Sequence, residues 1–316
     1  MSRLNPSISS KFNNIIINKL QSVKIFTVFD FVSEDTDKLV KITELTFKDI
    51  EKIKKEIVEK FGGKIKDPFQ LFIDQKSVTI TGISALDSLL GGGLYPGRIY
   101  EICGKSSSGK SQLCYTLAVN IAVKSSGTII HYIYTKKDFS ASRIQMILEN
   151  KKLDDEVAGR VMNQINTTHA KNVQQLFNVL YDFTQSLKQN SKNEKTKLII
   201  IDSLPGVFVM SEEKTEDNFS SLNHLTNVCH FLANEYALSI ITVNSVTQPW
   251  REIDGFEGKT TTAMKPTLGK YWLYIPNTRL LIEKGENESR TIKVWMCEDE
   301  KINSSVTVTI NNAGVY

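Results

Sequence analysis

GKSSSGKS, residues 104–111, matches the phosphate-binding pattern G-x-x-x-x-G-K-[ST] at every defined position. An apolar run at 98–103 precedes it and predicts a strand, and apolar residues at helical spacing follow it. In that setting the glycines let backbone N–H groups curl around phosphates at the positive end of a helix. Lys110 adds a charge for the β and γ oxygens, and the Ser111 hydroxyl can bind Mg²⁺. The predicted nucleotide contacts are Gly104, Lys105, Ser106, Ser107, Ser108, Gly109, Lys110, Ser111 and Gln112.

The alternative is a glycine-serine turn that matches the pattern by chance. A strand and a helix in register on the two sides make that alternative the weaker one. We therefore predict that the chain binds a nucleoside triphosphate.

A second element would complete the site. The apolar run 198–201 ends in Asp202, and a carboxylate at the end of such a strand would lie beside Ser111 and hold Mg²⁺ through water. The alternative for Asp202 is a cap for the helix that follows. Further on, Asn244 and Ser245 follow another apolar run, at the edge where a ligand-sensing polar side chain would project.

Size and composition describe an ordinary globular protein of 316 residues, with 41% hydrophobic and 23% charged residues. A formal net charge of +4 permits contact with nucleic acid through local patches but does not argue for it. The four cysteines lack C-x-x-C spacing, which favours reduced thiols in an intracellular protein. We see no signal peptide and no membrane span, so we expect a cytosolic or nuclear protein without membrane contact.

The pattern along the chain predicts three parts. Residues 1–61 show helical periodicity, with Thr46 as a helix cap, and predict a small all-α domain. Residues 62–76 read as a linker that carries Phe69 and Phe72, which could fold onto their own domain or dock on a neighbour. From 77 to 316 strands alternate with helices, so this part predicts an α/β core. The expected strands are 98–103, 128–133, 198–201, 239–243, 279–283, 291–297 and 306–310.

Two kinds of strand are expected. The runs at 128–133, 198–201 and 239–243 are nearly all apolar, as central strands buried on both faces require. The last two runs alternate in polarity around a polar turn, which favours a hairpin at the edge.

At this point the sequence resembles the eukaryotic RecA-like recombinases. The phosphate loop with its helix at 109–119 and the lead-in segments 81–87 and 89–94 are similar to theirs. The segments KPTLGKYW at 265–272 and IPNTRL at 275–280 narrow the resemblance to the D-type recombinase paralogues. The resemblance covers residues 77–316, and the first sixty residues agree only in layout. The phosphate loop is shared by many families, whereas the two later segments are far more specific.

The resemblance implies a RecA-like ATPase core with a mostly parallel twisted sheet and ATP, with Mg²⁺, bound at subunit interfaces. By similarity Arg143 belongs to the nucleotide site, and Lys265 and Pro266 lie near the ATP of an adjacent subunit. Two loops would face DNA, one around 207–219 and one between 244 and 265. The implied partners are other recombinase paralogues of the C-type and the X-ray-cross-complementing type, the main recombinase, and single-stranded or branched DNA in the nucleus.

The chain departs from the family pattern at two positions. Active recombinases place a glutamate after the second core strand to orient the attacking water, and Lys136 stands there instead. Asp138 is the one nearby carboxylate and could act as a displaced base, although a surface carboxylate is the simpler interpretation. Where active members have glutamine or histidine after the asparagine, this chain has the shorter Ser245. We therefore name no confident catalytic residue and expect weak hydrolysis.

The sequence leaves DNA contact open. Trp250, Arg251 and Lys259 suit base stacking and phosphate contact, but acidic residues in the same loop favour an incidental cluster. The first loop is acidic at 212–217, and the helical domain lacks a glycine-bearing hairpin, so that domain reads as a protein-docking unit. The leading hypothesis is an ATP-binding recombinase paralogue in a multi-subunit repair complex. The alternatives are an active DNA-stimulated ATPase that forms its own filaments and a scaffold whose site is vestigial.

Overall fold

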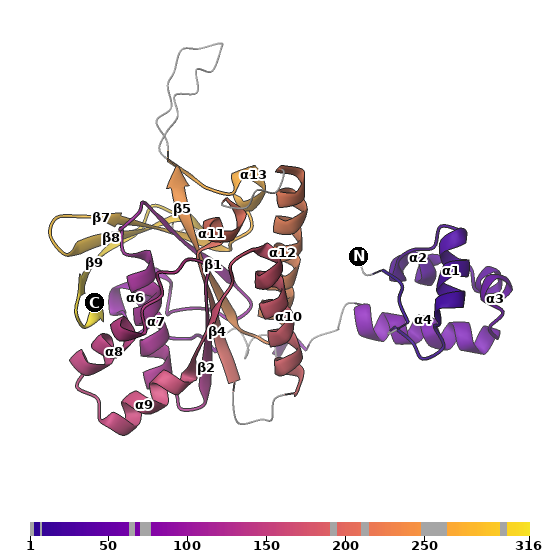
Figure 1. Ribbon diagram of the computed structural model, residues 1–316, viewed down its shortest axis with the longest axis horizontal. Helices are drawn as coiled ribbons and strands as arrows, with labels where there is room; N and C mark the ends of the chain where they lie inside the picture. Colours follow the sequence, from indigo (N-terminus) through magenta and orange to yellow (C-terminus); the bar gives the residue numbers. More distant parts are fainter. Residues whose placement is uncertain are drawn as a thin grey trace, which may run out of the picture. The chain divides into compact units, whose positions relative to one another are not determined.

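The computed structural model describes residues 3–6, 8–62, 67–69, 77–189, 195–209, 215–247, 264–297 and 302–316. Contacts within the chain divide it into two compact units, Met1–Leu71 and Phe72–Tyr316 (Figure 1). None of the helices in these ranges is long and apolar enough to cross a membrane.

The N-terminal unit is all helical, as predicted. Each of the four helices between residues 14 and 61 begins where a polar side chain accepts a hydrogen bond from a backbone N–H of the first turn, which satisfies a donor that the helix cannot. The predicted cap, Thr46, is confirmed and accepts from the N–H of Asp49 at 3.2 Å. Apolar side chains including Leu20, Phe31 and Leu39 fill the space between the helices. The helices are α1 (Asn14–Ser22), α2 (Val28–Ser33), α3 (Thr36–Thr43) and α4 (Phe47–Phe61).

The second unit is built on one ten-stranded sheet, in the order β10-β9-β8-β7-β1-β5-β4-β2-β3, with β6 paired to β5. The strands from β7 to β3 in that order run parallel, and β8, β9 and β10 extend the sheet antiparallel. The strands are β1 (Ile99–Gly104), β2 (Thr128–Tyr134), β3 (Ile165–His169), β4 (Lys195–Asp202), β5 (Ser239–Thr247), β6 (Lys265–Pro266), β7 (Thr278–Lys284), β8 (Ser289–Cys297), β9 (Ser305–Asn311) and β10 (Gly314–Val315).

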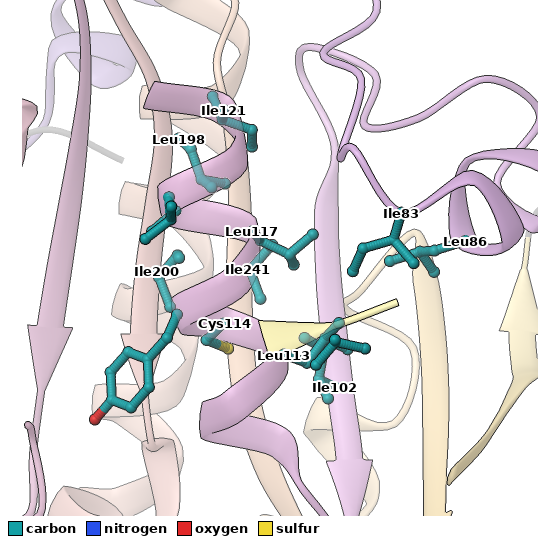
Figure 2. Packing of buried hydrophobic residues seen from close by; sticks show 14 of the residues in the cluster. Ile83, Leu86, Ile102, Leu113, Cys114, Leu117, Ile121, Leu198, Ile200 and Ile241 are labelled. Atoms are coloured by element: carbon teal, nitrogen blue, oxygen red, sulfur yellow. The ribbon is translucent and has the colours of Figure 1, made fainter. Parts of the chain in front are cut away.

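Helices cover both faces of the sheet, which explains the nearly continuous apolar runs of the central strands. On one face, Leu113 and Leu117 of α7 pack with Ile102 and Ile241 (Figure 2). On the other, Leu176 of α10 lies in a core cluster with the strand residues that point the opposite way, such as Ile199 and Ile240. The helices are α6 (Ser84–Leu89), α7 (Lys110–Lys124), α8 (Ala141–Asn150), α9 (Asp155–Gln164), α10 (Val173–Gln189), α11 (Leu204–Phe208), α12 (Thr215–Glu235) and α13 (Gly269–Trp272).

The predicted fold class is confirmed: an α/β core with a mostly parallel sheet follows a helical N-terminal unit. All seven predicted strands are present: β1 has the predicted length but is shifted by one residue, the other six are longer by one to four residues, and the last two form the predicted antiparallel pair. The sequence did not predict β3, β6 or β10.

Candidate nucleotide-binding site

The phosphate loop connects the carboxyl end of β1 to the first turn of α7, and a pocket of about 330 Å³ opens there. The ends of β4 and β5 form one wall because parallel strands end at the same edge of the sheet. Side chains of the antiparallel extension form another wall. The lining residues are Ser106, Ser107, Gly109, Lys110, Ser111, Gln112, Lys136, Asp138, Asp202, Ser203, Val243, Ser245, Arg290 and Ile310.

The loop residues take different places around this pocket. Gly109 has a φ of +110°, and a Cβ on it would lie 2.4 Å from Cδ1 of Ile310, so only glycine fits there. The pocket lining does not include three of the predicted contacts. Lys105 and Ser108 instead line a neighbouring cavity beside β7, and Gly104 is the last residue of β1.

Lys110 is held tightly at the start of α7. Its ammonium donates to the carbonyls of Gly104, at 2.9 Å, and Lys105, at 2.7 Å. Burial lowers the pKa of Lys110, the positive charge of Lys136 lowers it further, and the negative charge of Asp202 opposes both. The ammonium is thus a desolvated cation that an anionic ligand would stabilise.

Asp202 and Ser111 meet although ninety residues separate them in the sequence. Burial raises the pKa of Asp202, while hydrogen bonds from Ser111 and Tyr132 and the charge of Lys110 hold it down. The Tyr132 hydroxyl donates to Oδ2 of Asp202 at 2.7 Å. Tyr132, which no motif in the sequence marks, therefore orients the carboxylate from the neighbouring strand.

These residues fit a hydrated magnesium ion. The described part of the chain contains no group of three or more His, Cys, Asp or Glu side chains that could hold a metal ion. Mg²⁺ commonly binds through one or two protein oxygens together with substrate phosphates and water. Ser111 and Asp202 would supply those oxygens, and the ion would bridge and neutralise the phosphates.

Replacing Asp202 with asparagine should separate stability from metal binding. A raised pKa means that the buried charged form is unfavourable, so D202N is expected to stabilise the ligand-free protein by about 0.5–2 kcal/mol.

The same change, D202N, should remove the Mg²⁺ dependence of nucleotide affinity. In the wild type that dependence should weaken as pH falls through the raised pKa of Asp202, because protonation removes the metal ligand. Thermal unfolding and calorimetric titration of nucleotide with and without Mg²⁺ measure both effects. An unchanged response to Mg²⁺ in D202N would contradict the assignment.

Lys136 and Asp138 follow β2, and both line the pocket. The preceding residue fixes this strand end, because the Thr135 hydroxyl donates to the carbonyl of Ser203 at 2.6 Å and accepts from its N–H at 3.0 Å. The residue at the position of the usual glutamate is therefore presented to the site as a cation. Asp138 is exposed, in a segment that leads to α8.

The two residues at the end of β5 are directed differently. Ser245 lines the pocket, whereas Asn244 is fully buried and donates to Oε1 of Glu101 at 2.7 Å and to the carbonyl of Thr267 at 3.1 Å. Of the two residues at the predicted sensing position, Ser245 is thus the one that faces the pocket.

The structure places Arg143 beside the pocket but not in its lining. Its guanidinium donates to Oε1 of Gln112 and to the carbonyls of Asn311 and Asn312, so it ties α8 to α7 and to the turn after β9. Arg290 takes a place that the sequence did not predict: it lines the pocket, and its Nε donates to the carbonyl of Ser108 at 3.0 Å. No motif surrounds Arg290, and only the folding of β8 against the loop brings it there.

The structure describes three of the residues predicted to contact partners and DNA. In β6, which pairs with β5, Lys265 is exposed and Pro266 is buried. Phe69 is 67% exposed. Phe72, Trp250, Arg251 and Lys259 lie outside the described residues.

The fold and this site define a phosphate-loop α/β protein: the loop joins β1, a central parallel strand, to a helix, and an aspartate from β4, on the other side of β5, faces it. Comparison with known proteins narrows the class. The profile of the Rad51 family matches residues 74–316, and a profile described as RAD51D, N-terminal domain, matches residues 1–58. The chain belongs to the Rad51 family.

Curated relatives agree over most of the chain. It is 26% identical over 286 residues to DNA repair protein RAD51 homolog 4 of Bos taurus, covering 89% of this chain and 84% of the relative. It is 25% identical to the protein of the same name from Mus musculus, covering 85% and 81%. A DNA repair protein Rad51 homolog of Drosophila melanogaster is 30% identical, covering 68% of this chain and 63% of the relative.

Proposed function

We propose that this protein is an ATP-binding recombinase paralogue that works in the nucleus, within a multi-subunit complex, to assist repair of DNA by homologous recombination. The observation that carries the proposal is the complete phosphate loop facing the Ser111–Asp202 pair, in a chain whose two parts match the RAD51D N-terminal and Rad51 profiles. Lys110 and the backbone N–H groups of residues 105–111 would hold the phosphates of ATP, and Ser111 and Asp202 its Mg²⁺.

ATP would act mainly as a ligand at a subunit interface. The exposed Lys265 of β6 is our candidate for contact with the nucleotide of an adjacent subunit, with Pro266 beside it. A ligand that gains contacts only in the assembled state favours assembly by its difference in affinity. Phe69 and Phe72 are candidates for contact with a partner, in line with C-type and X-ray-cross-complementing paralogues as neighbours and the main recombinase as client.

Hydrolysis should be slow because the position that would orient water carries Lys136. A positioned acid or base contributes ~10²–10⁴ in rate. Replacing Lys136 with glutamate is therefore expected to raise the rate of steady-state phosphate release about tenfold or more. The rate should stay below that of an active family member, because Ser245 is shorter than the glutamine or histidine found there. The matched control is Lys137→Glu, which makes the same charge change one residue further from the nucleotide pocket. No gain in K136E would mean that another group limits hydrolysis.

The same assay tests the function. Phosphate release with and without single-stranded DNA, by the isolated chain and by the complex purified with its partners, should be slow in both. Fast DNA-stimulated release that Asp202→Ala abolishes would favour the alternative, an active ATPase that forms its own filaments. Failure to bind ATP even with the partners present would favour a scaffold with a vestigial site.

DNA binding by this protein belongs to the proposal. Trp250, Arg251 and Lys259 are candidates for single-stranded or branched DNA on residue chemistry.

A further inference from the structure

A second cavity, of about 540 Å³, lies at the carboxyl ends of β2 and β3 against α11. It is distinct from the nucleotide pocket and shares only Lys136 with it. Half of its lining residues are lysines or histidine. The lining residues are Thr135, Lys136, Lys137, His169, Lys171, Asn172, Gly206 and Val207. We call this cavity the lysine cleft.

The positive charge of the lysine cleft is not neutralised within the described residues. No carboxylate is among the residues that line it, and none of its three lysines takes part in an ion pair within 4.0 Å there. All three lysines are exposed at the surface. Lys136 is also close enough to Lys110 for the two charges to repel each other. Concentrated charge of one sign in a cleft attracts anions from solution.

The walls of the lysine cleft are well fixed. Gly206 of α11 packs so closely on β2 that a Cβ would lie 2.1 Å from Oγ1 of Thr135. The His169 ring stacks on Tyr134, with 4.8 Å between ring centroids and 5° between planes. The lysines thus extend from a preformed surface.

Two backbone donors at the start of α10 are already bonded to nearby side chains. The N–H of Lys171 donates to Oε1 of Gln175, and the N–H of Gln175 donates to Oδ1 of Asn172, both at 2.9 Å. The ammonium groups of the three lysines are the charged donors that the cleft offers to an anion.

We propose that the lysine cleft binds the phosphodiester backbone of single-stranded DNA. The proposal rests on the proposed function, in which DNA is a partner. Val207 in the wall of the cleft begins the first loop expected to face DNA, and the three lysines add contacts outside that loop. Lysine binds phosphate as a point charge on a flexible stem, so the exposed lysines of the cleft can follow a flexible phosphodiester backbone without the fixed geometry of an arginine fork. Protein–protein interfaces are depleted in lysine and enriched in arginine and aromatic residues. A single strand can bend into a cavity of this size, whereas duplex DNA is stiff over ~150 base pairs.

Lys137 and Lys171 provide the test, because neither lines the nucleotide pocket. Binding of a fluorescent oligo(dT) strand to the full chain is measured by anisotropy over a series of salt concentrations. For the double variant K137Q/K171Q we expect a five- to tenfold loss of affinity. Each phosphate contact contributes ~0.7 to the slope of log K against log salt on single strands, so the slope should shrink by about 1.4. The affinity for ATP should be unchanged.

The matched control is K48Q/K52Q, which removes two exposed lysines from α4 of the N-terminal unit. It should bind oligo(dT) like the wild type. If K137Q/K171Q keeps wild-type affinity and slope, the cleft is not a DNA site although DNA binding stands. If the wild type does not bind oligo(dT), this inference and the DNA-binding part of the proposed function both fail. If an oligoglutamate of matched charge competes as well as unlabelled oligo(dT), the cleft takes an acidic protein segment instead.

Discussion

Lys110→Ala is expected to lower the affinity for ATP at least about 100-fold. The ammonium lies at the start of α7, and burial makes its charge costly without an anionic partner. A hydrogen bond to a charged group is worth ~1.5–3 kcal/mol, and 1.4 kcal/mol is a factor of ten. The loss of more than one such contact to the β and γ oxygens gives the expected effect. Calorimetric titration with Mg²⁺-ATP measures it directly.

The control for this variant comes from the same helix. Lys124 is the exposed lysine in the last turn of α7, and Lys124→Ala removes an equal charge far from the loop. It should bind ATP like the wild type. Because the Lys110 ammonium also bonds two carbonyls of the loop, thermal unfolding of K110A must show that the fold is intact. Normal ATP affinity in a folded K110A would show that the phosphate loop does not bind ATP.

The central strands could be predicted from local sequence because their burial on both faces leaves its mark on each strand's own residues. A strand buried on both faces must be apolar along its length, and 128–133, 198–201 and 239–243 meet that requirement. The phosphate loop and Asp202 were predictable for a related reason. Both follow such strands directly, and the ends of parallel strands meet at one edge.

The edges of the sheet were not predictable in this way. Only Ile165 of β3 is buried, and Asn166 and Thr167 are exposed, so the strand shows no apolar run. It forms because β2 offers it a free edge to pair with. The two-residue strands β6 and β10 likewise exist only through their partners.

Within the site, the unpredicted parts depend on contacts between residues distant in sequence. Arg290 reaches the phosphate loop across 182 positions. Asn244 turns away from the ligand because Glu101, 143 positions earlier, accepts its hydrogen bond. In the sequence Glu101 is a charged residue within the apolar run 98–103, and nothing near it shows its partners.

Glu101→Ala is expected to lower the free energy of unfolding by about 3–5 kcal/mol, as loss of one partner from a buried ion pair does. Glu101 is fully buried in β1 and pairs with Arg279 of β7, which is 2% exposed. Its other oxygen accepts from Asn244 and, at 2.8 Å, from Nε1 of Trp272. Removal of the carboxylate leaves a guanidinium and two polar donors buried without their acceptor.

A double-mutant cycle separates the ion pair from the rest of the network. Glu101→Met with Arg279→Met removes both charges, and replacing a buried pair with apolar groups is often neutral. Asn244 and Trp272 would still lose their acceptor, so the double variant should remain below the wild type yet above E101A. For a unit of this size ~1 kcal/mol shifts Tm by ~2–4 °C, so E101A should melt roughly 6–20 °C lower. If E101A unfolded within 1 kcal/mol of the wild type, Glu101 could not be the acceptor that holds β5, β7 and α13 together beneath the nucleotide pocket.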